Sequence, residues 1–330
     1  MDKNNQLETA PIGKLVFKLA IPTVMAQLVN LLYNIVDRIY VGRIPEIGSL
    51  SLAGLGVTFP IILLVSAFAM LAGMGGASRA AVSMGEKDND KAEKILGNCT
   101  MLLIIFSVVL AVVFMLTKNQ ILMKFGASEA TLPYASDYIS IYLVGTIFVQ
   151  IALGLNLFIT NQGFAKTSMM TVCIGAVLNI VLDPIFIYVF GMGVKGAALA
   201  TIISQGVSCL WVLKFLTGKK TVLKIRLKNL ALDGKIVTSV LSLGVSPFIM
   251  QATECLIQLT FNNGMLKYGN DLYVALMSIL FSLTQLIWMP LNGFSQGAQP
   301  VIGYNYGAKR FDRVKKACLL YTSDAADDLT

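Results

Sequence analysis

The 330-residue sequence contains no histidine, and only 13% of its residues are charged. Without histidine there can be no Ser–His–Asp triad, no HExxH zinc site and no imidazole proton relay. Soluble domains carry roughly 25% charged residues, so this chain lacks the polar side chains that a water-facing surface needs. These absences exclude several enzyme classes and indicate that much of the protein surface faces lipid.

Sites for metals and nucleotides are also missing from the sequence. The five cysteines are widely spaced, and no pair has the separation of a metal-binding motif or of a disulfide framework. GMGVKG at 191–196 matches the glycine pattern of a dinucleotide site, but no acidic residue follows it at about twenty positions. GKKT at 218–221 lacks the upstream glycine of a phosphate loop. We therefore expect no cofactor, no nucleotide and no enzymatic activity.

What the sequence has instead is long apolar runs. Hydrophobic residues make up 56% of the chain, and its mean hydropathy is +0.73. A helix needs about 20 apolar residues to cross the hydrocarbon core of a membrane. Eight runs are long enough, and they cover 15–37, 54–79, 95–117, 133–160, 167–190, 194–216, 237–261 and 275–303. This pattern predicts an all-α membrane protein with eight transmembrane helices, the first of them retained and not cleaved as a signal.

Basic residues are distributed unevenly between the two sides of these predicted helices. If the N-terminus is cytoplasmic, the inner segments hold 20 of the 26 Lys and Arg residues. Cytoplasmic loops of membrane proteins carry such an excess of positive charge, so the asymmetry predicts a cytoplasmic N-terminus. It also accounts for the net charge of +8 without a nucleic-acid partner, which would require a soluble basic face.

Two segments of the chain resemble each other and predict two lobes. SMGEKDNDKAEK at 83–94 follows the second predicted helix, and NYGAKRFDRVKK at 305–316 follows the eighth. Repeats with an even number of helices are parallel and related by an axis along the membrane normal. We expect an N-terminal six-helix lobe at 1–216, a basic cytoplasmic linker at 217–236, and a partial C-terminal lobe at 237–320 that contains helices seven, eight and the start of nine.

The last ten residues do not continue this repeat. The counterpart of the helix at 95–117 should begin near Ala317, but 321–330 is polar and acidic. We interpret 321–330 as a non-native tail, so that four further helices would complete the second lobe. A genuine disordered tail on an eight-helix protein is the alternative.

Ionisable groups inside membrane helices are energetically costly and mark functional sites. Asp183 is the strongest candidate, because it lies within an apolar run that has no basic neighbour. Asn179 is one turn earlier on the same helix face, and Pro184 cannot donate a backbone hydrogen bond to the carbonyl of Ile180. These groups suit a small cation or a proton. The competing interpretation is an aspartate that hydrogen-bonds to neighbouring helices.

Other polar residues are expected at the same depth in the membrane. Asp37 ends the first predicted helix, where an interfacial position beside Arg38 is an equal alternative. With the N-terminus inside, Asp37 and Asp183 both lie in the outer half. The helices that begin near 194 and 133 run inward and place Thr201 and Tyr138 at a similar level. Polar groups from four helices of one lobe would therefore converge.

Four further positions have weaker interpretations. Asp137 lies in the first turn of its predicted helix, where favourable interaction with the helix dipole accounts for it. Glu254 in the seventh helix either meets a cationic substrate or bonds across helices. Pro22 and Pro247 occupy matching places in the two repeats. Because membrane helices tolerate proline-induced bending, we predict hinges at both.

A carboxyl group buried in the membrane has two stable states. Burial favours the neutral acid, whereas a nearby cation favours the carboxylate. Such a group can therefore exchange a proton for Na⁺ or for a cationic drug. That exchange is the physical basis of an antiporter.

Three separated motifs carry a resemblance to a known family. They are PTVMAQLVNLLYNIVDRIYVGR, LNIVLDPIFIYVFGMGVKGAALATIISQ and GFSQGAQPVIGYNYGAKRFDR. The sequence resembles the multidrug and toxic compound extrusion (MATE) family from about residue 12 to 318, and is most similar to its bacterial DinF-like branch. The resemblance implies twelve helices in two lobes of a bacterial inner-membrane transporter, which exports cationic amphiphiles in exchange for Na⁺ or H⁺.

The resemblance also implies particular site residues. The implied cation or proton site consists of Asp37, Asn179, Asp183 and Thr201, with Tyr138 beside it, a bend at Pro22 and a second acidic position at Glu254. We expect a monomer that meets the lipid bilayer and small-molecule substrates, and no nucleic acid. The main alternative is a flippase for lipids or lipid-linked oligosaccharides on a related scaffold, whose groove would need basic residues. A membrane enzyme would need a catalytic cluster, which the sequence does not show.

Overall fold

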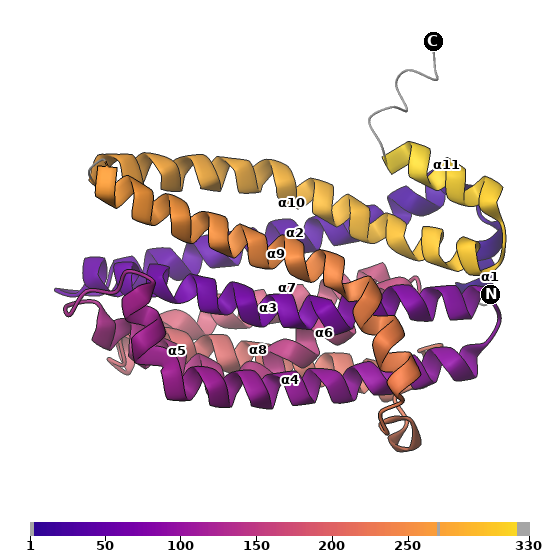
Figure 1. Ribbon diagram of the computed structural model, residues 1–330, viewed down its shortest axis with the longest axis horizontal. Helices are drawn as coiled ribbons and strands as arrows, with labels where there is room; N and C mark the ends of the chain where they lie inside the picture. The colour runs from indigo at the N-terminus through magenta and orange to yellow at the C-terminus, as the bar shows by residue number, and fades with distance from the viewer. Residues whose placement is uncertain (1–2, 269–270, 322–330) are drawn as a thin grey trace, which may run out of the picture.

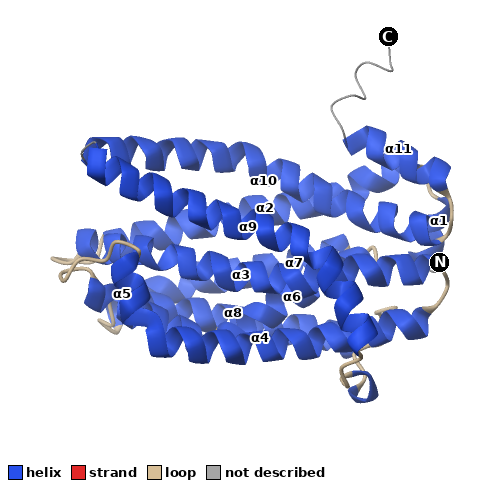
Figure 2. Ribbon diagram, in the orientation of Figure 1, coloured by secondary structure: helices blue, strands red, loops and turns tan. Residues whose placement is uncertain are grey.

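The computed structural model describes residues 3–268 and 271–321 (Figure 1). Within these ranges every regular element is a helix and none is a strand (Figure 2). The α-helices are α1 (Lys3–Thr9), α2 (Ile12–Gly42), α3 (Gly48–Gly85), α4 (Asn89–Lys124), α5 (Leu132–Val144), α6 (Thr146–Asn161), α7 (Ala165–Pro184), α8 (Val194–Thr217), α9 (Gly234–Tyr268), α10 (Asp271–Gly307) and α11 (Phe311–Tyr321). The predicted all-α fold class is confirmed. Of the tail predicted at 321–330, all but Tyr321 lies outside the described residues.

The described helices have the lengths and compositions that a membrane requires. Six are long and apolar enough to cross it, and α5 with α6 makes a seventh when the bent pair is taken as one span. The eighth predicted run, 275–303, lies within α10. Each of the eight predicted runs therefore coincides with one helix or one helix pair.

The single helix predicted over 133–160 is wrong. The chain breaks at Gly145, and α5 and α6 meet there at 59°. A Cβ atom at Gly145 would lie 2.1 Å from Cδ1 of Ile202 on α8, a distance that atoms cannot adopt. Because Gly145 has no side chain, the Ile202 side chain of α8 can pack directly against the bend. An uninterrupted apolar run cannot reveal such a contact.

The helix predicted over 167–190 changes its winding at Pro184. There α7 ends, and residues Ile185–Val189 form a short π-helix, η1. Proline has no backbone N–H to donate, and wider π turns are frequent at functional sites. The backbone N–H of Phe190 donates to the Ile185 carbonyl at 2.9 Å and closes this turn. The irregularity expected beside Asp183 is therefore present.

The hairpin of α9 and α10 packs on the first helices of the chain. In Figure 1 it lies along α2 and α3, with α9 against α3 and α10 against α2. The backbones of α3 and α9 approach closely, because a Cβ atom on Gly244 would lie 1.9 Å from the Leu71 carbonyl oxygen. The Thr23 hydroxyl on α2 donates to the Gly293 carbonyl on α10 at 2.5 Å.

The connection between α8 and α9 is docked on α6. It contains only a short 3₁₀ turn, η2 (Leu227–Asn229). The side-chain oxygen of Gln162 accepts hydrogen bonds from the Thr221 hydroxyl at 2.8 Å and from the backbone N–H groups of Val222 and Leu223 at 2.9 Å each. The predicted linker region is thus held against the first set of helices.

Candidate functional site

Four helices bring the predicted site residues together at the end of the bundle that we expect to face outward. Asp37 comes from α2, Asn179 and Asp183 from α7, Tyr138 from α5 and Thr201 from α8. Asp183 is fully buried, Asn179 is 2% exposed, Tyr138 is 5% exposed and Asp37 is 9% exposed. Thr201 is half-buried. The convergence expected from helix depth alone is therefore seen in space.

The side chains of this cluster contact one another directly. The Asn179 amide donates to Oδ1 of Asp183 at 3.3 Å and to the Thr201 hydroxyl oxygen at 3.4 Å. The Thr201 hydroxyl itself donates to the Ala197 carbonyl at 3.0 Å. The carboxyl groups of Asp37 and Asp183 interact with each other. One connected polar group thus links α2, α7 and α8.

Three buried oxygens in this cluster receive no hydrogen bond from the described residues. They are Oδ1 of Asp37, Oδ1 of Asn179 and Oδ2 of Asp183. A buried polar atom without a partner is unfavourable by about 1–3 kcal/mol, and such an atom in a folded protein calls for an explanation. All three are acceptors, so the cluster is short of positive charge or of donated protons.

The alternative interpretation of Asp37, an interfacial partner of Arg38, does not match the geometry. Asp37 is buried and takes part in none of the described ion pairs. The guanidinium group of Arg38 instead lies over the ring of Phe59, 5.4 Å from its centre. A cation over an aromatic face is stabilised by the ring quadrupole. Arg38 therefore forms no ion pair with Asp37, although its charge acts on that carboxyl group, which interacts with Asp183 of α7.

The two helices that carry the acids are tied together beyond the cluster. Tyr188 of the π-helix η1 donates its hydroxyl hydrogen to the Tyr40 carbonyl of α2 at 2.7 Å. The rings of Tyr40 and Tyr188 also meet edge to face, with centres 6.4 Å apart. The change of winding after Pro184 thus places a residue that joins η1 to the C-terminal end of α2.

Two aromatic residues of the site were not predicted. Tyr33 on α2 lies near both Asp37 and Asp183, and Tyr142 on α5 stacks on Tyr138 with ring centres 6.4 Å apart. Each is four positions from a predicted site residue, so each shares a helix face with it. That spacing was the signal that could have identified them.

The other candidate residues lie elsewhere. The helix dipole is not the whole explanation of Asp137, because its carboxylate is 3.4 Å from the Lys195 ammonium group. Glu254 has an exposed side chain on α9 and does not join the cluster. Both Pro22 and Pro247 lie inside helices that continue through them, so their predicted role as hinges stays a prediction.

The donor set decides which ligands the cluster could hold. No group of three or more His, Cys, Asp and Glu side chains suited to a metal ion occurs in the described part of the chain. Two carboxylates, an amide oxygen and a hydroxyl are hard oxygen donors, which favour alkali or alkaline-earth cations and protons over transition metals. The unpartnered oxygens fit a small monovalent cation or a shared proton.

Comparison with known proteins agrees with this architecture. The family model MatE matches residues 22–185 and 247–322. These two segments contain all the predicted cluster residues except Thr201. The gap between them covers η1 after its first residue, α8, the docked connection and the first part of α9.

Individual relatives match nearly the whole chain. The sequence is 28% identical to the multidrug export protein MepA of Staphylococcus haemolyticus (strain JCSC1435), over 92% of this chain and 67% of that protein. It is 26% identical to MepA of Staphylococcus aureus (strain NCTC 8325 / PS 47), over 93% of this chain and 68% of that protein. The chain thus spans about two-thirds of the length of these relatives.

Solved structures show the same fold. A MATE protein crystallised in complex with MaD3S aligns with a TM-score of 0.87 and 28% identity, over 96% of this chain and 70% of that one. A MOP superfamily transporter from Pyrococcus furiosus, described as having a binding pocket of reverse polarity, aligns with a TM-score of 0.88 and 27% identity over 96% and 69%. The helices of this chain are therefore arranged as in transporters.

Proposed function

Because the chain belongs to the MatE family, we propose that it is a secondary antiporter that exports cationic or amphiphilic drugs in exchange for Na⁺ or H⁺. The similar MepA proteins are multidrug exporters, which supports the substrate class. The family consists of multi-pass membrane proteins, and the apolar helices α2 to α9 agree with that, with α5 and α6 taken as one bent span. Its proposed location is a bacterial inner membrane with the N-terminus in the cytoplasm, and the charge asymmetry of the loops supports that orientation.

The observation that carries the coupling proposal is the contact between two buried carboxyl groups. Two like charges in a medium of low dielectric repel strongly, so Asp37 and Asp183 are stable together only with a proton or a cation between them. Each also has an oxygen that receives no hydrogen bond. The pair therefore supports the binding of one positive charge, which a cation or a proton would supply.

The cluster has the parts that exchange requires. Asn179 and Thr201 add an amide oxygen and a hydroxyl oxygen beside the carboxyl pair, and Tyr138 faces the same group. Binding of a drug cation near the pair would compete with the coupling ion for the same negative charge, and release of one would favour the other. The drug cation and the coupling ion are thereby linked through one site, as antiport requires.

The first experiment is the isosteric substitution Asp183→Asn. It removes one ionisable group while retaining size and one oxygen, so we expect the protein to fold and cation-coupled efflux to fall at least about 100-fold, which corresponds to about 2.7 kcal/mol. The measurement is ethidium efflux from proteoliposomes driven by an imposed Na⁺ or H⁺ gradient.

The matched control is Asp137→Asn. It is the same chemical change at a similar depth, but Asp137 is half exposed and pairs with Lys195 outside the cluster. We expect efflux to stay within about twofold of the unsubstituted protein, since an exposed ion pair contributes about 1 kcal/mol or less. Efflux by Asp183→Asn at the level of this control would refute the proposal.

A flippase for lipids or lipid-linked oligosaccharides is the second candidate. Its substrates carry phosphate groups, so its interior should contain buried basic residues. Among the described residues, the buried ionisable side chains Asp37, Glu93 and Asp183 are all acidic, and no lysine or arginine is buried. The acidic character of these buried side chains thus favours a cationic substrate over a phosphate-bearing lipid. Transfer of a fluorescent lipid by the protein, with no dye efflux, would reverse this preference.

A further inference from the structure

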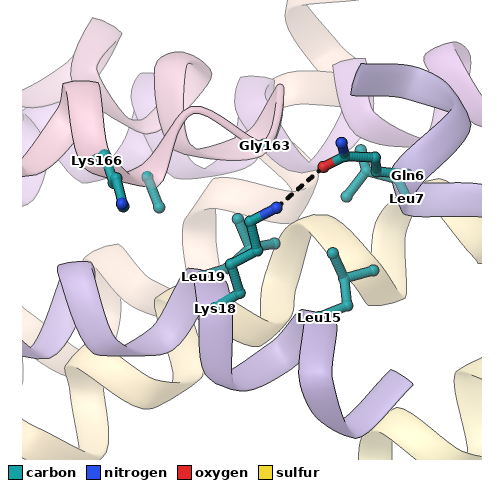
Figure 3. Close-up of a pocket in the computed structure, with 8 residues that line it drawn as sticks. Gln6, Leu7, Leu15, Lys18, Leu19, Gly163 and Lys166 are labelled. Carbon is teal, nitrogen blue, oxygen red and sulfur yellow. Dashed lines mark hydrogen bonds between the residues drawn. The ribbon is translucent and has the colours of Figure 1, made fainter. Parts of the chain in front are cut away.

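A separate pocket lies at the opposite end of the bundle from the acidic cluster. It is formed by α1, the start of α2 and the turn between α6 and α7 (Figure 3). Leu7, Leu15 and Leu19 make its apolar part, and Lys18 and Lys166 extend into it from facing helices. None of the described residues that line it is acidic. The pocket therefore combines an apolar floor with two positive charges.

Both lysines have their charge available to a ligand. The Lys18 ammonium group donates to the side-chain oxygen of Gln6 at 3.2 Å, which is a neutral partner. Neither Lys18 nor Lys166 belongs to any ion pair among the described residues, and both side chains are exposed. Two unneutralised ammonium groups beside one pocket attract an anion, and a phosphate group can accept hydrogen bonds from both.

Exposed apolar stripes run along the membrane from each lysine. On α2, Ile21 and Met25 follow Lys18 on one helix face and are 60% and 46% exposed. On α7, Met170 follows Lys166 by one turn and is 43% exposed. The helices α2 and α7 pack side by side. The two lysines thus lie at the predicted cytoplasmic ends of exposed apolar side chains, on two helices that pack together.

This combination matches the shape of a lipid. We propose that the pocket binds an anionic phospholipid of the inner leaflet, with Lys18 and Lys166 contacting its phosphate group. Its acyl chains lie along the stripes that begin at Ile21 and Met170. A free phosphate ion would use the lysines but not the stripes. An anionic lipid uses both, and each basic residue near the membrane surface contributes about tenfold or less to its binding. The proposal depends on the predicted orientation and not on transport activity.

The test measures lipid binding to the purified chain. Native mass spectrometry of the protein in detergent would follow titrations with phosphatidylglycerol and with phosphatidylcholine. We expect phosphatidylglycerol to bind more tightly, and the double substitution Lys18→Gln with Lys166→Gln to weaken its binding by about tenfold or more. Lys18→Arg with Lys166→Arg should retain the binding, because the positive charges remain.

The matched control is Lys219→Gln with Lys220→Gln. These lysines are exposed and lie on the same predicted side, but neither lines the pocket. We expect less than about a twofold change, since both follow the end of α8 and lie outside the pocket. Equal losses in both double variants, or equal affinity for the two lipids, would overturn the proposal. Inorganic phosphate that displaces phosphatidylglycerol at equal concentration would show a free-anion site and would overturn the lipid assignment.

Discussion

At the scale of single residues, the side chains of the candidate site orient one another through hydrogen bonds. Asn179 shares its amide hydrogens between Asp183 and Thr201, and its own buried oxygen receives no hydrogen bond from the described residues. An amide oriented in this way presents an oxygen to a cation at no further desolvation cost. The hydroxyl of Thr201 donates to its own helix, so its oxygen serves the cluster as an acceptor, as it does for the Asn179 amide.

Thr201 therefore provides a sharp test of the cation site. The substitution Thr201→Val keeps the volume and removes the oxygen, so we expect the affinity for the coupling ion to fall about tenfold, equivalent to about 1.4 kcal/mol. Thr201→Ser keeps the oxygen and should stay within about threefold. The measurement is the Na⁺ concentration, or the proton concentration, that gives half-maximal efflux.

The half-maximal ion concentrations of these two variants decide the role of Thr201. If Thr201→Val shifts the half-maximal concentration and Thr201→Ser does not, the hydroxyl oxygen contributes to ion binding. If both variants behave as the unsubstituted protein does, the site needs no oxygen from α8, and Thr201 must be removed from it.

At the scale of elements, short connections between helices fix the arrangement as firmly as the helices do. Gln162 follows the last turn of α6, is fully buried, and accepts three hydrogen bonds from the chain that joins α8 to α9. Nearby, the carboxylate of Glu93 at the start of α4 accepts a hydrogen bond from the backbone N–H of Lys224 and forms an ion pair with Arg226 at 2.7 Å. The connection is therefore held at several points and not free.

Replacing Gln162 should loosen this connection. Gln162→Leu leaves the N–H groups of Val222 and Leu223 buried without acceptors, at about 1–3 kcal/mol each. We expect the melting temperature of the purified protein to fall by several degrees. Gln120→Leu on α4 makes the same change at an exposed position and should leave the melting temperature unaltered. Equal melting temperatures for both variants would contradict the structural role of Gln162.

At the scale of the whole molecule, the two ends of the described chain meet. Asn305 on α10 donates to the Leu7 carbonyl of α1 at 3.1 Å, and Arg313 on α11 donates to the Ala10 carbonyl at 2.7 Å. Leu7 is 1% exposed and packs in the core. The short helix α1 thus joins the first helices to the α9–α10 hairpin at the end opposite the acidic cluster.

Breaking this contact should free α1. In Arg313→Gln the hydrogen bonds to the carbonyls of Leu7 and Ala10 are lost, so we expect amide hydrogens at 6–10 to exchange at least about tenfold faster, which corresponds to about 1.4 kcal/mol. Hydrogen–deuterium exchange with mass spectrometry measures this directly. Arg310→Gln removes the ion pair with Glu8 and a hydrogen bond to the Glu8 carbonyl at 3.3 Å, both at an exposed position, and should have a smaller effect. Similar exchange in the two variants would count against the role of Arg313.

How much of this could be predicted from sequence depends on the range of the interaction. Asp183 and Asn179 share a helix face by their spacing, and both were identified from local pattern alone. Tyr33 and Tyr142 obey the same spacing, but a tyrosine in an apolar run resembles ordinary packing. The break at Gly145 was not predictable, because the side chain that packs against this glycine is Ile202, a residue 57 positions away.

The sequence by itself determined that the chain forms long membrane helices, which way they are expected to run, and which acids lie within them. These properties follow from apolar length and from the placement of charge, which act locally. Only the tertiary structure decided that Asp37 meets Asp183 and forms no ion pair with Arg38, that α5 and α6 bend apart, and that α1 contacts α10 and α11. Each of these depends on side chains brought together from distant parts of the chain, and helix packing in three dimensions selects those contacts.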